Sequence, residues 1–317
     1  MDALTSKYDL AIAWTWKFDF EFVQLLERTA VNQSLSVLLI DRSSVNGFLE
    51  QLRNGLVSFR FFFDRASDED DTFQPLARFV QKRNREQDLA RSIRTINPLD
   101  VVSRASDKAT MHLELLSHGI NVPYTIIVSP YNHRMEVELS LSELARLGRP
   151  FIIKPANTTG GGVGVVTGAE SLKDVIEARQ HHRSDKYLLQ ENIHPAFVDT
   201  RRGWFRVFYA FGEVLPCWWD DQTHVYSVLD HHSQEIANCT ELQTITLSIH
   251  EVCNLDFFST ELVLTPEKKI VAVDYVNEMC DMRLQSLHPD GVPDAIVKRI
   301  SELLVGFVQK ERQAGPA

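Results

Sequence analysis

Residues 151–167 are the stretch that most constrains what this chain can fold into. An apolar segment ending in Lys154 precedes a polar loop with three consecutive glycines, and β-branched residues resume after the loop. The pattern predicts a strand, a flexible loop and a second strand. Consecutive glycines let the backbone approach a ligand closely and direct N–H groups toward it, which favours a bound phosphate. A glycine-rich hairpin turn beside a solvated lysine explains the same residues equally well.

The first hundred residues alternate buried and amphipathic segments. The predicted strands are 8–14, 36–40 and 56–63, and the predicted helices between them are 18–29 and 45–52. This alternation favours an open parallel sheet with ligands at the carboxyl ends of its strands. No Gly-x-Gly-x-x-Gly follows the first strand, so a dinucleotide-binding domain is unsupported. The acidic run 68–71 is interpreted as a solvated surface or a helix start, because four adjacent carboxylates cannot converge on one ion.

The remainder of the chain predicts two further lobes that mix helices with antiparallel strands. In the first, the predicted helices are 106–118, 140–147 and 171–181, and the predicted strands beside the glycine loop are 122–128 and 187–193. In the second, two hairpins (204–219 and 257–276) are followed by a helix over 293–310, with another helix at 242–252. The fold class is therefore an α/β lobe (1–104) followed by two α+β lobes (105–187 and 188–317).

Composition limits the partners and the compartment. The net charge of −10 argues against non-specific nucleic-acid binding, which needs a basic surface. No apolar run reaches membrane-spanning length, and the first residues do not have the order of a signal peptide. The four cysteines show no paired zinc spacing, so we expect reduced thiols. These features predict a cytoplasmic protein that binds neither nucleic acid nor a membrane.

Two carboxylates interrupt the last predicted hairpin. Glu261 and Asp274 lie among apolar residues, and Asn277 ends the second strand. Burying such carboxylates is costly unless a cation pairs with them, and oxygen ligands of this kind suit Mg²⁺. A solvated strand end is the alternative interpretation.

The order of these features resembles the ATP-grasp superfamily. A lysine precedes the glycine-rich hairpin, a strand runs into Gln190-Glu-Asn-Ile193, Arg206 lies on the next strand, and the carboxylates and the asparagine follow on a late hairpin. The likeness is greatest to the group of ribosomal-protein glutamate ligase, glutathione synthetase and D-alanine:D-alanine ligase. It implies the ATP-grasp fold, in which the two α+β lobes clasp a nucleotide.

The resemblance also implies nucleotide contacts. Lys108 and Lys154 would contact the phosphates, and the loop would close over the β- and γ-phosphates. Adenine would lie against the hinge strand, with Asp199 or Glu191 on the ribose, because Trp204 occupies the place of the usual acidic ligand. The implied loop and hinge residues are Thr158, Thr159, Gly160, Gly161, Gly162, Gln190, Glu191, Asn192 and Ile193.

The implied metal site departs from the family's usual form. Glu261, Asp274 and Asn277 would hold two Mg²⁺ ions, which Mn²⁺ would be able to replace. Asp274 and Asn277 are one residue farther apart than the usual Glu-x-Asn. Strand residues three apart face opposite sides, so both can reach one metal only across a bulge or at a strand end.

The resemblance implies an ATP-dependent ligase that joins a carboxylate to an amine through an acylphosphate. Its catalytic residues would be Lys154, Arg206 and Arg283. Arg283 is interpreted either as a ligand of a substrate carboxylate or as a surface arginine paired with Asp281. Substrates would be small molecules or peptides, and a homodimer is compatible with the resemblance. The alternatives are a small-molecule kinase on the same nucleotide site and a nucleotide-binding protein without turnover.

Overall fold

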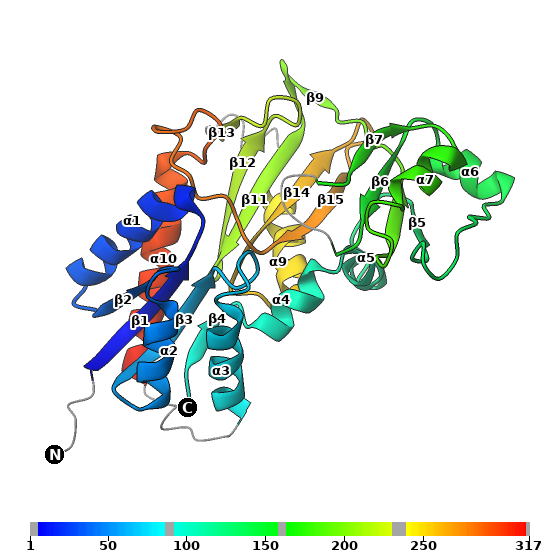
Figure 1. Cartoon of the computed structure of the whole chain (residues 1–317). Helices are drawn as coiled ribbons and strands as arrows, with labels where there is room; N and C mark the ends of the chain where they lie inside the picture. The colour runs from blue at the N-terminus through cyan, green and yellow to red at the C-terminus, as the bar shows by residue number, and fades with distance from the viewer. Residues whose placement is uncertain (1–5, 86–91, 158–162, 230–238, 315–317) are drawn as a thin grey trace.

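The computed structural model describes residues 6–85, 92–157, 163–229 and 239–314, and these form three main sheets (Figure 1). The first sheet is parallel, and the other two are antiparallel. The expected succession of one α/β lobe and two α+β lobes is confirmed. No helix among the described residues is long and apolar enough to cross a bilayer.

The N-terminal sheet has the strand order β2-β1-β3-β4, with all pairs parallel. Its third strand contains Phe61, Phe62 and Phe63, which are all buried, as expected for a strand covered on both faces. Helices α1 and α10 cover one face, and α2 and α3 cover the other (Figure 1). The elements are β1 (Ser6–Trp14), a short 3₁₀ turn (Lys17–Asp19), α1 (Phe20–Asn32), β2 (Val37–Ile40), α2 (Val45–Arg53), β3 (Val57–Arg65), α3 (Gln74–Arg85) and β4 (Arg94–Ile96).

The helix predicted over residues 106–118 is confirmed as α5 (Lys108–Ser117), and a helix that was not predicted, α4 (Leu99–Ser106), precedes it. Asp107 lies between them in an extended conformation, and its carboxylate accepts hydrogen bonds from the N–H groups of Ala109 and Thr110 at 2.9 and 3.1 Å. This cap begins a new helix and places Lys108 in its first turn.

The central sheet has the order β5-β8-β6-β7, with every pair antiparallel. Strands β6 and β7 form the predicted hairpin, and residues 158–162 at its tip lie outside the described part of the chain. The boundary placed near residue 188 falls inside β8, all four residues of which are buried. The elements are β5 (Thr125–Val128), α6 (Leu141–Leu147), β6 (Phe151–Pro155), β7 (Val166–Ala169), α7 (Leu172–Ala178) and β8 (Tyr187–Gln190).

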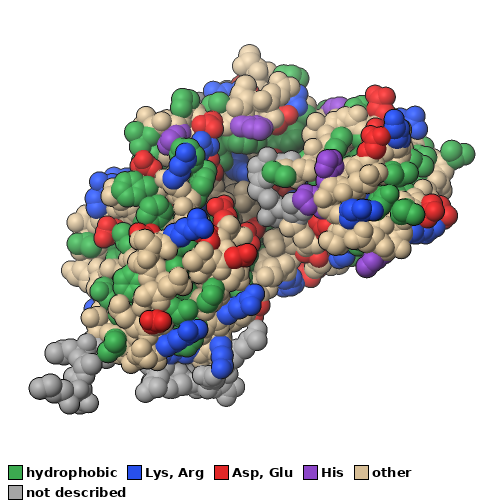
Figure 2. Space-filling model, in the orientation of Figure 1, with side chains coloured by type: hydrophobic (Ala, Val, Ile, Leu, Met, Phe, Trp, Pro, Cys, Tyr) green, Lys and Arg blue, Asp and Glu red, His purple; other side chains and the backbone are tan. Residues whose placement is uncertain are grey.

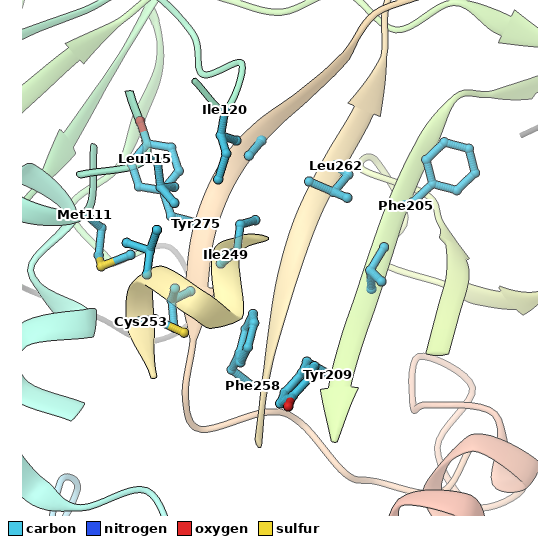
Figure 3. Close-up of a cluster of buried hydrophobic side chains, with 14 of the residues drawn as sticks. Met111, Leu115, Ile120, Phe205, Tyr209, Ile249, Cys253, Phe258, Leu262 and Tyr275 are labelled. Carbon is cyan, nitrogen blue, oxygen red and sulfur yellow. The ribbon is translucent and has the colours of Figure 1, made fainter. Parts of the chain in front are cut away.

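The C-terminal sheet has the order β13-β12-β11-β14-β15. Helices α5 and α9 cover one face, where Met111, Ile249, Phe258 and Leu262 meet in one core (Figure 3). The other face shares a core with α10 and the first sheet. The elements are β9 (Phe197–Val198), β10 (Arg201–Arg202), β11 (Trp204–Ala210), β12 (Glu213–Trp219), β13 (Tyr226–Val228), α9 (Cys239–Cys253), β14 (Phe257–Leu264), β15 (Ile270–Asn277) and α10 (Asp294–Ala314).

Candidate functional site

A row of charged side chains crosses three strands of the C-terminal sheet. Arg206 on β11 lies opposite Glu261 on β14, and Glu261 lies opposite Asp274 on β15. Nη1 of Arg206 is 2.7 Å from Oε1 of Glu261 and 3.9 Å from Oδ2 of Asp274. The indole N–H of Trp204 donates to Oε2 of Glu261 at 3.1 Å. Cross-strand register therefore gathers residues that are far apart in the sequence.

A β-bulge brings Asn277 to the same face. Ser259 pairs with Asn277, and Glu261 pairs with Asp274. A step of two residues along β14 is therefore matched by a step of three residues along β15. The extra residue shifts the side-chain alternation, and with its amide oxygen directed at Arg206, Asn277 accepts from Nη2 at 3.2 Å. The bulge required by the unusual Asp-x-x-Asn spacing is thus present.

Arg206 is held as a buried cation. Its side chain is 12% exposed, and burial opposes its charge, but Glu261, Tyr226 and Asp274 outweigh burial and raise its pKa. The ring of Trp219 lies 5.4 Å from the guanidinium carbon. Nε of Arg206 is buried without a hydrogen-bond partner among the described residues. The guanidinium is therefore fixed in position on this face.

Lys154 reaches this row from the central lobe. It lies on β6, and its Nζ donates to the carbonyl of Val273 at 3.0 Å. Val273 has no cross-strand partner in the register of β15, so its carbonyl is available to the lysine. Burial lowers the pKa of Lys154, whereas Asp274 and Glu261 act to raise it and Lys108 acts to lower it. The lysine joins the two lobes at the site.

Lys108 approaches from the start of α5. Its backbone N–H donates to the carbonyl of Ala156, just after β6, at 3.0 Å. Its charge acts on Lys154 and on Glu278. The two predicted lysines therefore lie on the same side of the site, one from a helix start and one from a strand.

An apolar patch lies beside the charged row. Ile193 and Trp204 pack against Val263, Val271 and Val273. A small, flat group such as a purine ring is suited to an apolar patch of this kind next to charged residues. Ile193 is therefore part of an apolar surface next to the charged row.

The hinge residues before Ile193 use their side chains within the protein. Nε2 of Gln190 donates to the hydroxyl of Tyr275 at 3.0 Å. Oε1 of Glu191 accepts from the N–H of Tyr124 at 2.6 Å, and the N–H of Glu191 donates back to the carbonyl of Tyr124 at 2.9 Å. Asn192 is exposed. One carboxylate oxygen of Glu191 is thus already engaged by the backbone.

The other predicted residues are placed as follows. Arg283 forms ion pairs with Asp281 at 2.7 Å and with Asp290 at 2.9 Å, so its guanidinium already has two carboxylate partners. Asp199 is exposed in the turn between β9 and β10 and has a φ of 53°. Thr158, Thr159, Gly160, Gly161 and Gly162 lie outside the described residues.

The donor set of the row fits Mg²⁺. Two carboxylates and one amide oxygen converge on one face, and hard oxygen donors are what this ion binds. Within the described part of the chain, no three His, Cys, Asp or Glu side chains form a metal-binding group. Glu261, Asp274 and Asn277 are the residues that would hold the ion.

A cavity of about 350 Å³ lies beside this row, at an edge of the first sheet where the sequence predicted ligand binding without naming the carboxylates of the wall. It is formed at the carboxyl ends of β3 and β4, by α4 and by the residues that follow β15. Asp64, Asp68 and Glu278 contribute carboxylates to its wall, and burial raises the pKa of each, that of Glu278 to about 7. The position of Glu278 next to Asn277 was the signal in the sequence. Figure 2 shows Asp and Glu side chains gathered where the two halves of the molecule meet.

Comparison with known proteins identifies relatives by structure only. No family model matches the sequence, and no curated protein does. A RimK domain ATP-grasp protein from Sphaerobacter thermophilus has a TM-score of 0.61 at 16% identity, covering 94% of this chain and 98% of that chain. D-alanine–D-alanine ligase from Bacillus anthracis, complexed with ATP, has a TM-score of 0.63 at 14% identity, covering 97% and 99%.

A third solved structure is a macrocyclase, MdnC from Microcystis aeruginosa, bound with the precursor peptide MdnA. It has a TM-score of 0.60 at 13% identity, covering 94% of this chain and 99% of that chain. All three alignments extend over nearly the whole of both chains. The protein from Sphaerobacter thermophilus is named as an ATP-grasp protein, and the other two structures share its fold with this chain.

Proposed function

The chain has the ATP-grasp fold, and from this premise we propose that it is an ATP- and Mg²⁺-dependent ligase that joins a carboxylate to an amine. The observation that carries the proposal is the convergence of Lys154, Arg206 and the Glu261–Asp274–Asn277 set at the junction of two lobes. The similar structures support it, because one is a D-alanine–D-alanine ligase complexed with ATP and another a macrocyclase bound with a peptide.

The cations of this site suit phosphoryl transfer. Lys154 and Arg206 are both half-buried and fixed by hydrogen bonds, so they would neutralise phosphate charge without reorganising. Glu261, Asp274 and Asn277 would hold Mg²⁺, whose charge would help to neutralise the phosphates during transfer. Lys108 adds a third positive group at the start of α5. The apolar patch around Ile193 would hold the adenine ring.

The proposed reaction has two steps. The substrate carboxylate attacks the γ-phosphate, which gives ADP and an acylphosphate. The amine then attacks the acyl carbon, phosphate leaves, and the amine loses a proton. Catalysis rests on positioning and charge neutralisation, because the protein forms no covalent intermediate in this sequence.

An isotope experiment tests the proposal. The protein is incubated with ATP, Mg²⁺ and a panel of carboxylates labelled with ¹⁸O in the carboxyl group, each paired with a panel of amines. A ligase of this class transfers ¹⁸O from the carboxylate to inorganic phosphate, since the acyl oxygen leaves with the phosphoryl group. A phosphorylated hydroxyl product without free phosphate would instead identify a kinase, and ATP binding without ADP release over the whole panel would identify a protein without turnover.

A further inference from the structure

We infer that the cavity beside the charged row binds the amine substrate as an ammonium ion with an apolar body, and that Glu278 and Asp68 recognise the charge. The inference deepens the proposed function and rests on it for the identity of the bound amine as the acceptor. The binding site itself is argued from the cavity and its wall.

Glu278 is a buried carboxylate on which the charge of Lys108 acts, but no described residue forms an ion pair with it. It is 6% exposed, forms part of the cavity wall, and has no hydrogen bond or ion pair with another residue in the described ranges. An unpaired buried carboxylate is costly, and a cation inside the cavity would offset that cost. The missing partner is therefore a positively charged group of a ligand.

The charges of the cavity wall favour a cation. Asp64, Asp68 and Glu278 lie on the wall, and the charge of Asp68 acts directly on Glu278. Arg65 is the basic residue of the wall, but both Nε and Nη2 bond to Asp19 at 2.7 Å, so its charge is already balanced. The cavity is thus negative overall, with a neutralised arginine.

Apolar side chains also line the wall, together with several polar ones, and the apolar side chains suit an apolar portion of the ligand. A volume of about 350 Å³ lies within the range of small-molecule sites. The side chains that would contact a hydrocarbon or aromatic body are Phe62, Phe63, Leu99, Val101, Val102 and Met279. A primary amine with an apolar body matches both the charge and the lining.

The position of Glu278 places the ammonium at the reaction site. Glu278 directly follows Asn277, and Asp274 and Lys108 both act on it electrostatically. An amine held there lies beside the row to which Lys154 and Arg206 belong. The bound ammonium would give up a proton to solvent before its nitrogen attacks the acyl carbon, so the charged group and the reacting group are the same nitrogen.

Binding is tested without ATP by isothermal titration of the full chain with phenethylamine, phenethyl alcohol and hydrocinnamate. These probes share one apolar body and carry a positive, a neutral and a negative end. Phenethylamine is expected to bind at least about tenfold more tightly than the alcohol, the size of one charge-assisted hydrogen bond. Equal binding of amine and alcohol, or tighter binding of hydrocinnamate, would overturn the inference.

Variants locate the site. Glu278→Gln should weaken phenethylamine about tenfold or more and leave the alcohol unchanged. Asp68→Asn, at an exposed position on the rim, should weaken the amine by a smaller factor and serves if Glu278→Gln does not fold. Asp71→Asn is the matched control, because Asp71 is exposed in the same acidic run and lies outside the cavity wall. An amine affinity that survives both cavity substitutions would contradict the assignment.

The same measurements separate this inference from the proposed function. Amine binding that fails while ADP and phosphate are released with other substrates would reject the cavity and leave the ligase. Amine binding that depends on Glu278 in a protein that never turns over ATP would keep the cavity and reject the ligase.

Discussion

Two groups of acidic side chains lie next to each other at Asn277 and Glu278. They differ in whether the protein supplies a cation that pairs with them. On the sheet face, Glu261 and Asp274 are paired with Arg206, and the indole of Trp204 adds a hydrogen bond to Glu261. In the neighbouring cavity, Glu278 is more deeply buried and forms no ion pair within the described residues, although the charge of Lys108 acts on it. The first group has its paired cation within the protein, whereas the second does not.

The difference teaches how a fold can prepare two binding sites in adjacent residues. A buried carboxylate with a built-in arginine has a fixed geometry that an arriving ion or phosphate uses. A buried carboxylate in apolar surroundings is destabilised until a cation enters. The following predictions test this contrast, from the largest expected effect to the smallest.

Lys154→Met should have the largest effect, on activity. It removes the buried cation that joins β6 to the carbonyl of Val273, and ATP turnover should fall at least about 100-fold. Steady-state ADP release measures the change, and circular dichroism checks that the fold is intact. Lys173→Met is the control, because Lys173 is an exposed lysine of the same lobe. Unchanged turnover in Lys154→Met would exclude this lysine from the site.

Arg206→Met should have the largest effect on stability. It leaves Glu261 buried without its partner, and the free energy of unfolding should fall by about 3–5 kcal/mol. Urea denaturation measures it. Arg299→Met breaks the exposed pair with Glu213 and should cause a much smaller change. Similar losses in both variants would show that the charged row is not held as a buried set.

Glu278→Gln should change stability in the opposite direction. Without a bound amine, replacing an unpaired buried carboxylate by an isosteric amide should raise the free energy of unfolding at pH 8 by about 1–3 kcal/mol. Glu261→Gln, made in the paired group, should lower it. A loss of stability in Glu278→Gln would mean that its carboxylate has a stabilising partner, and the contrast between the two groups would fail.

The smallest expected effect is a pH dependence of the free energy of unfolding that arises from His112. Burial lowers the pKa of His112, whose Nδ1 lies 2.7 Å from the hydroxyl of Tyr275 on β15. The folded state therefore binds this proton less readily than the unfolded chain, so the stability contribution is present above pH 6.5 and is lost as pH falls toward the folded pKa. Urea denaturation at pH 7.5 and 5.5 should show the loss in the native chain and a smaller one in His112→Gln. Identical pH dependence in both would remove His112 as its source.

Local signals in the sequence predicted most of the strands and the helix starts. The apolar runs of β1, β3, β14 and β15 are continuous enough to be read without tertiary information. The helix start at Asp107 was predicted, but helix α4 before it was not, since so short a helix depends on packing more than on its own sequence, and the extended conformation of Asp107 separates the two helices. The helix α4 then supplies one wall of the cavity.

The charged row was predicted as a set, but its geometry was not. Asp274 and Asn277 are three residues apart in the sequence. On a regular strand this spacing would place their side chains on opposite faces. The bulge depends on how β14 pairs with β15, and this pairing is decided by packing on both faces of the sheet. The spacing alone therefore predicts that a bulge is needed but not that one forms.

By itself, the sequence determined the order of the lobes, the glycine-rich hairpin and the residue types of the proposed nucleotide and metal site. These features are local, because they depend on periodicity, turn residues and the identity of single side chains. Only the tertiary structure decided that Glu261 is paired and Glu278 is not. Burial and pairing depend on residues from other strands and helices, as the pairing of Glu261 with Arg206 shows. The spacing of residues along the chain does not give the distance between such side chains.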